Sequence, residues 1–216
     1  MNTEHSYGLR QFEDARWTSG PQQPVWRHSV AAKLVRREPV LDIGGGDGLL
    51  LQLLARQGMR QSTLIDISPV AVARARETGF RALEHDFTDQ LPFSDREFAC
   101  ATLLEVLEHF YDPVSLLREA ARVADDIVVV VPNFHYWRDR VQMISGRVPF
   151  QSRPRRGHVH WFNDQLLAEV IDAAGLRVDA QIVGGFTRLG PIGPWLAKVR
   201  PRLFATTFAV RLIENT

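Results

Sequence analysis

A loop with three consecutive glycines and two carboxylates is the part of the sequence that points most directly to chemistry. It runs from Asp42 to Gly48 as DIGGGDG, after the apolar stretch PVL and before the leucine-rich stretch LLLQLLARQG. A strand, a glycine-rich turn and a helix in this order bring backbone amides and a helix N-terminus to a ligand. Gly44 and Gly46 let the backbone approach that ligand with no Cβ in between. The loop therefore predicts a cofactor site.

The spacing and the charge of this loop discriminate between two cofactors. The dinucleotide pattern G-x-G-x-x-G requires a third glycine where this chain has Leu49. A pyrophosphate would also be repelled by Asp47, by roughly 4 kcal/mol at about 4 Å with an effective dielectric of about 20. S-adenosylmethionine (SAM) carries a sulfonium and an ammonium and no phosphate, so the same acids attract it. The loop predicts SAM over NAD; the alternative without a ligand is a tight turn whose acids cap the helix.

Two further acids stand at the ends of the next two expected strands. Asp66 ends LIDIS, 22 residues beyond Gly44, where an acid can accept hydrogen bonds from both ribose hydroxyls. Asp86 ends EHDF, where it can accept from an adenine amino group while Phe87 packs on the ring. With Asp42, three acids at successive strand ends predict a ligand across the switch point of an open sheet.

The elements that must position these acids alternate between strand and helix. Apolar runs predict strands and 3.6-residue periodicity predicts helices, so the order indicates a doubly wound, mostly parallel α/β sheet of seven strands. The expected strands are 39–43, 61–68, 80–87, 97–105, 125–133, 176–185 and 203–214, and the expected helices are 25–37, 49–58, 69–79, 112–124 and 162–175. A Gly- and Pro-rich linker precedes the last strand and offers no crossover helix, which predicts an antiparallel last strand.

Two segments stand outside this alternation within a single expected domain, 1–216. Residues 1–24 are polar and read as an N-terminal loop or entry arm. Residues 132–160 interrupt the sheet pattern and carry six arginines against one aspartate. An excursion of this length is typically functional, so we expect a lid that selects the substrate.

Composition excludes several classes of protein. The formal charge of +1 gives no overall field to recruit nucleic acid or an anionic membrane. The single cysteine, Cys100, excludes an internal disulfide and a multi-cysteine zinc site. The polar N-terminus lacks the apolar core of a signal peptide, and no apolar run reaches the roughly 20 residues that span a bilayer. We therefore expect a cytoplasmic protein with no membrane and no nucleic-acid partner.

The stretches VLDIGGGDG, LIDIS and HDFTDQLPFSDREFACATLLEVLEH together resemble the class I SAM-dependent methyltransferases, over roughly residues 35–135. LPFSDREFACATLLEVLEHFYDP is similar to the small-molecule branch of that group. The resemblance implies a Rossmann-like fold and SAM as cofactor, with a small-molecule substrate. It also implies the cofactor-binding residues, which are Asp42, Gly44, Gly45, Gly46, Asp47 and Gly48 for the methionine end, Asp66 and Ile67 for the ribose, Asp86 and Phe87 for the adenine, and Leu104 and Glu105 beside the sulfonium.

A narrower resemblance lies further along the chain. VVVVPNFHYWRDRVQMISGRVP is similar to the MetW family of methionine-biosynthesis proteins. That likeness implies a SAM-binding partner that associates with a homoserine acyltransferase and supports its activity. A methyltransferase, a MetW-like partner and, on weaker grounds, a nicotinamide oxidoreductase are therefore the three hypotheses.

Methyl transfer needs positioning and sometimes a base, and three residues are candidates for that chemistry: His109, His135 and Tyr136. His158 and His160 share one side of an extended segment, but no third ligand accompanies them in the sequence, so no metal is expected. An anionic substrate or acidic partner surface is predicted from the arginines of the excursion, which are Arg138, Arg140, Arg153, Arg155 and Arg156.

Overall fold

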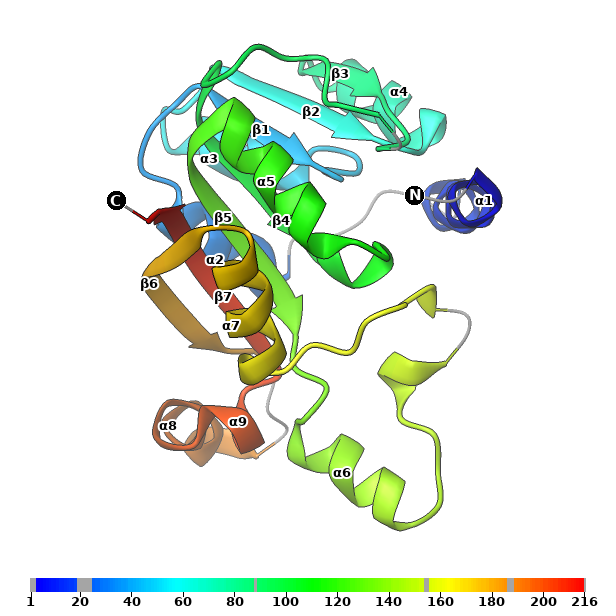
Figure 1. Cartoon of the computed structure of the whole chain (residues 1–216), viewed down its shortest axis with the longest axis vertical. Coiled ribbons are helices and arrows are strands. Elements are labelled where there is room, and N and C mark those ends of the chain that lie inside the picture. The colour runs from blue at the N-terminus through cyan, green and yellow to red at the C-terminus, as the bar shows by residue number, and fades with distance from the viewer. Residues whose placement is uncertain (1–2, 19–24, 88, 154–155, 186–188, 216) are drawn as a thin grey trace.

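Seven strands form one sheet in the order β3-β2-β1-β4-β5-β7-β6 (Figure 1). The computed structural model describes residues 3–18, 25–87, 89–153, 156–185 and 189–215. The strands are β1 (Val40–Ile43), β2 (Ser62–Asp66), β3 (Arg81–Glu84), β4 (Phe98–Leu104), β5 (Ala124–Pro132), β6 (Leu176–Gly184) and β7 (Thr207–Glu214). β1 to β5 pair in parallel, and β7 lies antiparallel between β5 and β6. The predicted mostly parallel sheet with an antiparallel last strand is confirmed.

Helices cover both faces of this sheet, as a doubly wound fold requires. One buried cluster joins the sheet to α2, α3 and α4, and another joins its opposite face to α5, α7 and α8. The α-helices are α1 (Thr3–Thr18), α2 (Trp26–Leu34), α3 (Leu49–Arg56), α4 (Pro69–Glu77), α5 (Pro113–Val123), α6 (Trp137–Ile144), α7 (Asp164–Ala173), α8 (Gly193–Val199) and α9 (Pro201–Phe204). Short 3-10 turns are η1 (Leu107–His109), η2 (Phe150–Ser152) and η4 (Gly190–Ile192).

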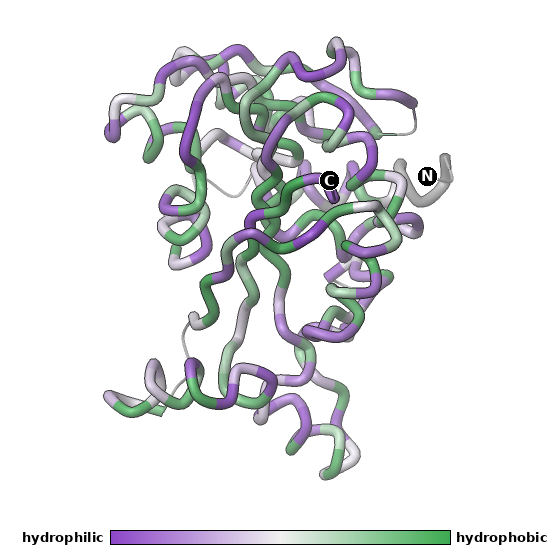
Figure 2. The backbone as a smooth tube through the Cα atoms, turned by 60° about the vertical axis from the view of Figure 1, so that its left-hand side comes forward, coloured by the Kyte–Doolittle hydropathy of each residue, from purple (hydrophilic) through white to green (hydrophobic). Residues whose placement is uncertain are grey.

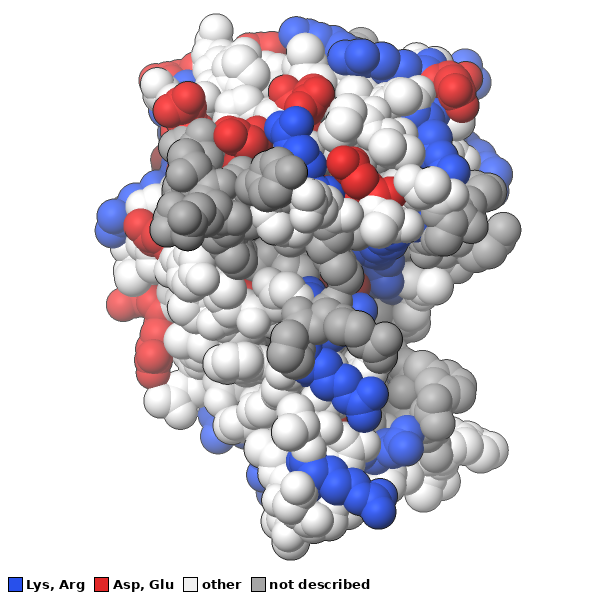
Figure 3. All heavy atoms as spheres, turned by 90° about the vertical axis from the view of Figure 1, so that its right-hand side faces the viewer, with Lys and Arg blue, Asp and Glu red and all other residues white. Residues whose placement is uncertain are grey.

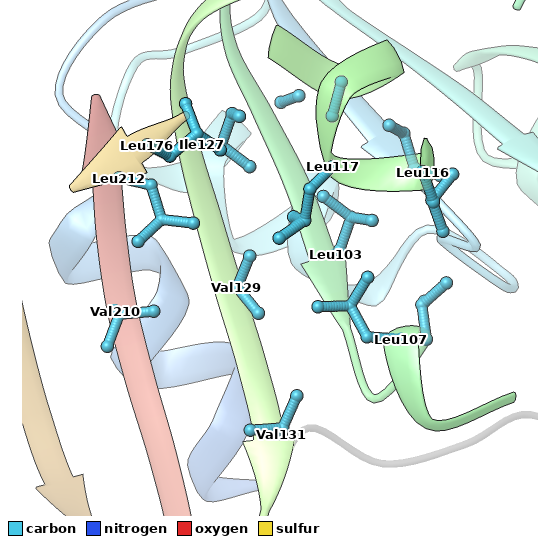
Figure 4. Close-up of a cluster of buried hydrophobic side chains, with 14 of the residues drawn as sticks. Leu103, Leu107, Leu116, Leu117, Ile127, Val129, Val131, Leu176, Val210 and Leu212 are labelled. Carbon is cyan, nitrogen blue, oxygen red and sulfur yellow. The ribbon is translucent and has the colours of Figure 1, made fainter. Parts of the chain in front are cut away.

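The centre of the core is β5, whose side chains are buried on both faces. Ile127, Val129 and Val131 point to the α5 side, where Leu103 and Leu117 meet them (Figure 4). The residues between them pack against the helices of the opposite face. The unbroken β-branched run predicted a strand covered on both sides, and the hydrophobic strands do run through the middle of the molecule (Figure 2).

Parallel pairing in this register brings the functional strand ends to one edge of the sheet. Asp42 pairs with Leu64 of β2 and with Thr102 of β4. Asp66, the last residue of β2, pairs with Glu84 of β3. Asp42 and Asp66 therefore lie toward the carboxyl ends of neighbouring parallel strands, where open α/β sheets bind ligands.

The loop predicted for residues 1–24 is wrong over most of its length, because α1 occupies Thr3–Thr18. Ser19–Pro24 lie outside the described residues. Leu9, Glu13 and Trp17 are four residues apart and so share one face of the helix. Leu9 and Trp17 are buried against the rest of the protein. Because the segment has so few apolar positions, it is polar on average, and its sequence shows no clear pattern of an amphipathic helix.

Two other segments are more helical than predicted. The Gly- and Pro-rich linker before β7 contains α8 and α9, each with a proline in its first turn, where no N–H is needed. The excursion 132–160 contains α6 and η2, and α6 lies at the opposite end of the long axis from β3 and α4 (Figure 1). At the start of α7, by contrast, Asn163 caps the helix as predicted by accepting from the Leu166 N–H at 2.7 Å. None of the described helices is both long enough and apolar enough to cross a bilayer.

Candidate functional site

The glycine loop between β1 and α3 adopts backbone angles that glycine alone reaches easily. Gly46 has φ +59°, and a Cβ on it would lie 2.3 Å from the Trp17 ring of α1. A Cβ on Gly45 would lie 2.6 Å from Cδ1 of Leu64 and 2.7 Å from a carboxylate oxygen of Asp42. The glycines therefore allow close approach from two sides, by side chains of β1 and β2 and by α1.

Asp66 fixes the shape of this loop. The Gly46 N–H donates to one carboxylate oxygen of Asp66 at 2.9 Å, and the Ser68 N–H donates to the other at 2.9 Å. Burial raises the pKa of Asp66 to about 6, although both hydrogen bonds act in the opposite direction. Asp66 thus holds the loop to the end of β2. Each oxygen keeps a further acceptor position, so the predicted contact with ribose hydroxyls stays a prediction.

Asp42 is the second buried carboxylate beside the loop. The Thr102 hydroxyl donates to its Oδ1 at 2.6 Å, and its side chain is almost completely buried. Burial raises the pKa of Asp42 to about 7, and the negative charge of Asp66 adds to the rise. A cationic ligand beside the two acids would reduce the free-energy cost of burying their charges. The donor set therefore fits a cofactor that is cationic where it meets the loop, as SAM is.

A cavity opens directly above the loop. It encloses about 810 Å³, counting the part that is open to solvent, which is within the range of small-molecule sites. Strand-end loops of β1, β2, β3 and β4 contribute to it, together with α1 and α2. Ten of the predicted cofactor residues line it, namely Asp42, Gly44, Gly45, Gly46, Asp47, Asp66, Ile67, Phe87, Leu104 and Glu105.

Two predicted cofactor residues are not among those that line the cavity. Gly48 forms the N-terminal boundary of α3 with φ +82°, so its role in the structure is to turn the chain into the helix. Asp86 directly precedes Phe87, whose ring is part of the wall, but Asp86 itself is not. The predicted contact of Asp86 with adenine therefore has no direct support in the geometry of the cavity.

α1 supplies a wall that the sequence did not predict. Leu9, Glu13, Arg16 and Trp17 all line the cavity. α1 is anchored to the β2–β3 part of the sheet: the Ser68 hydroxyl donates to the carboxylate of Asp14, and Arg10 pairs with Glu84 at 2.7 Å. The signal for this helix was the four-residue spacing of Leu9, Glu13 and Trp17.

α2 contributes two more residues that sequence reasoning missed. Arg27 lies 3.4 Å from Glu105, so this guanidinium faces the acid expected beside the sulfonium. His28 lines the cavity as a neutral ring, because burial lowers its pKa to about 4 and its Nδ1 accepts from the Val25 N–H at 3.1 Å. Nothing in their spacing distinguishes these two from other helix residues.

The three predicted catalytic residues do not come together. His109 follows β4 in η1 and lines the cavity. His135 and Tyr136 are not among the cavity-lining residues; Nδ1 of His135 lies 3.2 Å from the side-chain amide of Asn163. The side chain of Asn133 accepts from the His135 N–H at 3.0 Å and so holds this turn at the end of β5, from which the chain continues into α6.

The arginines of the excursion have separate environments. Arg140 donates to the His135 carbonyl at 2.7 Å, and the Arg156 guanidinium lies 5.0 Å from the Phe150 ring centre. Arg155 lies outside the described residues. Figure 3 shows basic side chains spread singly over the lower part of one face. An anionic substrate or an acidic partner surface at these arginines stays a prediction.

The two histidines at the end of the excursion also diverge. Nε2 of His160 lies 3.1 Å from the Tyr111 carbonyl oxygen, whereas the ring of His158 lies edge-on to that of His109 with centres 4.9 Å apart. His158 and His160 therefore have different neighbours and do not face a common site.

Comparison with known proteins identifies a family for this chain. The profile of a family described as "Methyltransferase domain" matches residues 23–181. A ubiquinone biosynthesis O-methyltransferase of Xanthomonas oryzae pv. oryzae is 34% identical over 123 residues, covering 50% of this chain and 51% of that protein. The Sodalis glossinidius protein of the same name is 36% identical over 89 residues, covering 39% and 36%. The chain thus spans about half the length, or less, of these relatives.

Solved structures share the fold at low sequence identity. The magnesium protoporphyrin IX methyltransferase of Synechocystis PCC 6803 superposes with a TM-score of 0.67 at 15% identity, covering 97% of this chain and 99% of that one. A putative Haloferax volcanii methyltransferase, solved in complex with the Trm112 methyltransferase activator, gives a TM-score of 0.67 at 21% identity, with coverage of 96% and 98%. At these identities the likeness establishes the Rossmann-like methyltransferase fold and nothing finer.

Proposed function

This chain belongs to the methyltransferase-domain family, and from that membership we propose that it transfers a methyl group from SAM to a small molecule. The observation that carries the proposal is the pair of buried acids, Asp42 and Asp66, at the wall of a cavity large enough for cofactor and acceptor. A cationic ligand would stabilise the ionised form of these buried carboxyl groups, whereas a pyrophosphate would be repelled by it. The same charge argument, together with Leu49, disfavours the nicotinamide hypothesis.

SAM supplies a methyl group on a positively charged sulfur, which a nucleophile takes by in-line displacement. The chain's own contribution is to bind, orient and exclude water. Asp66 and the glycine loop that it holds form one part of the cavity wall, and α1 forms another. Among the predicted catalytic residues, His109 is the one whose side chain reaches the cavity. We therefore assign His109 the contact with the acceptor, in preference to His135 and Tyr136.

The names of the relatives suggest which methyl acceptors to assay first. The similarity to ubiquinone biosynthesis O-methyltransferases supports testing phenolic and catechol-like hydroxyls first. The experiment is a radiolabel assay in which methyl-labelled SAM is incubated with the full chain and panels of phenols, carboxylic acids and amines. Label in an extracted phenol would support the proposal. SAM binding without transfer to any panel would contradict it.

A second candidate function is a MetW-like, SAM-binding partner of a homoserine acyltransferase. It is supported by the sequence likeness across β5 and α6 and by exposed apolar side chains on the excursion, which include Val141, Ile144, Val148 and Phe150. A docking surface would cover these residues. A pull-down of purified homoserine acyltransferase, with Ile144→Asp and Phe150→Asp as surface variants, tests it. A stable complex that both variants weaken, with no methyl transfer, would favour this function over the first.

A further inference from the structure

Glu108, in η1, carries a deeply buried carboxyl group. Its residue is 1% exposed, and neither carboxylate oxygen has a hydrogen-bond partner among the described residues. Folded proteins rarely leave a buried carboxyl group in this state, because its desolvation is not compensated. A missing partner, supplied from outside the chain, is the simplest account.

Two imidazoles complete a set of metal-binding groups around this carboxylate. One ligand atom each from Glu108, His109 and His158 lies within 4.8 Å of the other two. Nε2 of His158 is 3.9 Å from Oε1 of Glu108. Two ligands of one ion, each about 2.1 Å away, are at most about 4.2 Å apart. The His158–Glu108 distance meets that limit, and the whole set would need only a small contraction.

Backbone contacts orient both rings as metal ligands require. Nδ1 of His109 lies 3.1 Å from the Gly157 carbonyl oxygen, so this nitrogen is the hydrogen-bond donor toward that carbonyl. The His158 ring forms a hydrogen bond with the Gln151 backbone. Metal-ligating histidines characteristically donate their other ring N–H to a carbonyl or carboxylate.

Arg156 is the competing partner for Glu108, because it lines the same small cavity. The arrangement argues against it: the Arg156 guanidinium lies over the Phe150 ring, and among the described residues no ion pair within 4.0 Å joins it to Glu108. Its Nε also lacks a hydrogen-bond partner in the described chain. Arg156 therefore does not neutralise the Glu108 carboxylate by a direct ion pair among the described residues.

We propose that Glu108, His109 and His158 bind one divalent cation at the wall of the cofactor cavity. Two nitrogens and one carboxylate favour a transition-metal ion such as Zn²⁺ or Mn²⁺ over Ca²⁺ or Mg²⁺, which prefer oxygen ligands. Three protein ligands leave a coordination position open, as in catalytic metal sites. His109 then meets the acceptor through the cation, and does not act as its base.

The position of the site indicates what the open position would take. The small cavity around Glu108 encloses about 280 Å³. It shares four lining residues with the cofactor cavity, namely Glu13, Arg16, Glu105 and His109. A cation here would bind an oxygen of the acceptor close to the cofactor, so the acceptor would carry a hydroxyl, phenol or carboxylate. This step rests on the proposed function, whereas the binding of the cation does not.

The cation is tested by direct binding to the full chain. Protein stripped with a chelator is dialysed against Zn²⁺, Mn²⁺ or Mg²⁺ at micromolar concentration, and bound metal is measured by elemental mass spectrometry. We expect about one Zn²⁺ or Mn²⁺ per chain, and affinity reduced about 100-fold or more in Glu108→Gln and His158→Gln. His160→Gln is the matched control, since His160 lies two residues away, bonds to the Tyr111 carbonyl and is outside the cluster. It should bind metal as the parent does.

Circular dichroism and binding of S-adenosylhomocysteine report whether each variant is folded. The site is disproved if the stripped parent takes up none of these ions, or if folded Glu108→Gln and His158→Gln retain the parent's affinity. Methyl transfer by stripped and reloaded protein then separates the two proposals. Equal rates would refute the acceptor contact alone, and bound metal without any methyl transfer would refute the proposed function while the cation site stands.

Discussion

Replacing Asp42 by asparagine measures how much stability the protein loses by burying this carboxylate. Asn has the same shape, and its Oδ1 can still accept from the Thr102 hydroxyl, which donates at 2.6 Å. The change therefore removes the charge and leaves the local packing intact. In the absence of SAM, we expect the variant to be more stable than the parent at neutral pH.

The magnitude follows from the pKa of Asp42, which rises from its ordinary value of 3.8 to about 7 because of burial. Since the folded state holds this proton more tightly than the unfolded state, stability contributed by the group falls as pH rises from about 4 to about 7. At about 1.4 kcal/mol per pKa unit, the full loss is roughly 4 kcal/mol. Relaxation around the charge reduces this figure, so we expect Asp42→Asn to gain about 2 to 4 kcal/mol at pH 8 and almost nothing at pH 4.

The assay is urea unfolding of parent and variant at pH 4 and pH 8, with SAM titrated calorimetrically into both at pH 8. SAM should bind at least about tenfold more weakly to the variant, because a charge-assisted contact contributes about 1.5–3 kcal/mol. Lower stability of Asp42→Asn than of the parent at pH 8 would refute the reasoning, and so would an equal gain at both pH values.

Three further predictions concern the loop and the excursion. Asp66→Ala should weaken SAM binding about tenfold or more while circular dichroism shows an intact fold, and unchanged affinity would disprove its role at the site. Gly46→Ala should destabilise the protein by at least about 1–2 kcal/mol, because Gly46 has a φ of +59°. It should also make α1 more sensitive to limited proteolysis, since the new Cβ would lie 2.3 Å from the Trp17 ring. A variant as resistant to protease as the parent would contradict the contact between Gly46 and α1. His135→Ala should leave calorimetric SAM affinity within about twofold, because His135 is not among the residues that line the cavity, and a tenfold loss would show that the cavity extends to β5.

The sheet could be predicted from the sequence because its signals are local. The β-branched run of β5 and the alternation of strands and helices each occupy one continuous stretch. The glycine loop combines a strand end, positive φ angles and a helix start within a few residues. Its position at the site therefore follows from the chain order.

The parts that could not be predicted depend on contacts between distant segments. α1 packs against the glycine loop and Ser68, which are distant from it in the sequence. Because it has few apolar positions of its own, its local sequence pattern does not predict a helix. His135 was expected at the cofactor because it follows a strand end, but its direction is set by the side chain of Asn133. The grouping of Glu108 with His158 arises where the excursion returns to η1, and no spacing rule connects them.

Calorimetric titration of the full chain with SAM and, separately, with NAD tests the central claim most directly. The buried acids beside the glycine loop should attract cationic SAM and repel the pyrophosphate of NAD. We therefore predict one SAM bound per chain with micromolar affinity, and no heat of binding from NAD at the same concentration. NAD bound more tightly than SAM, or no binding of SAM at all, would contradict the assignment of this cavity.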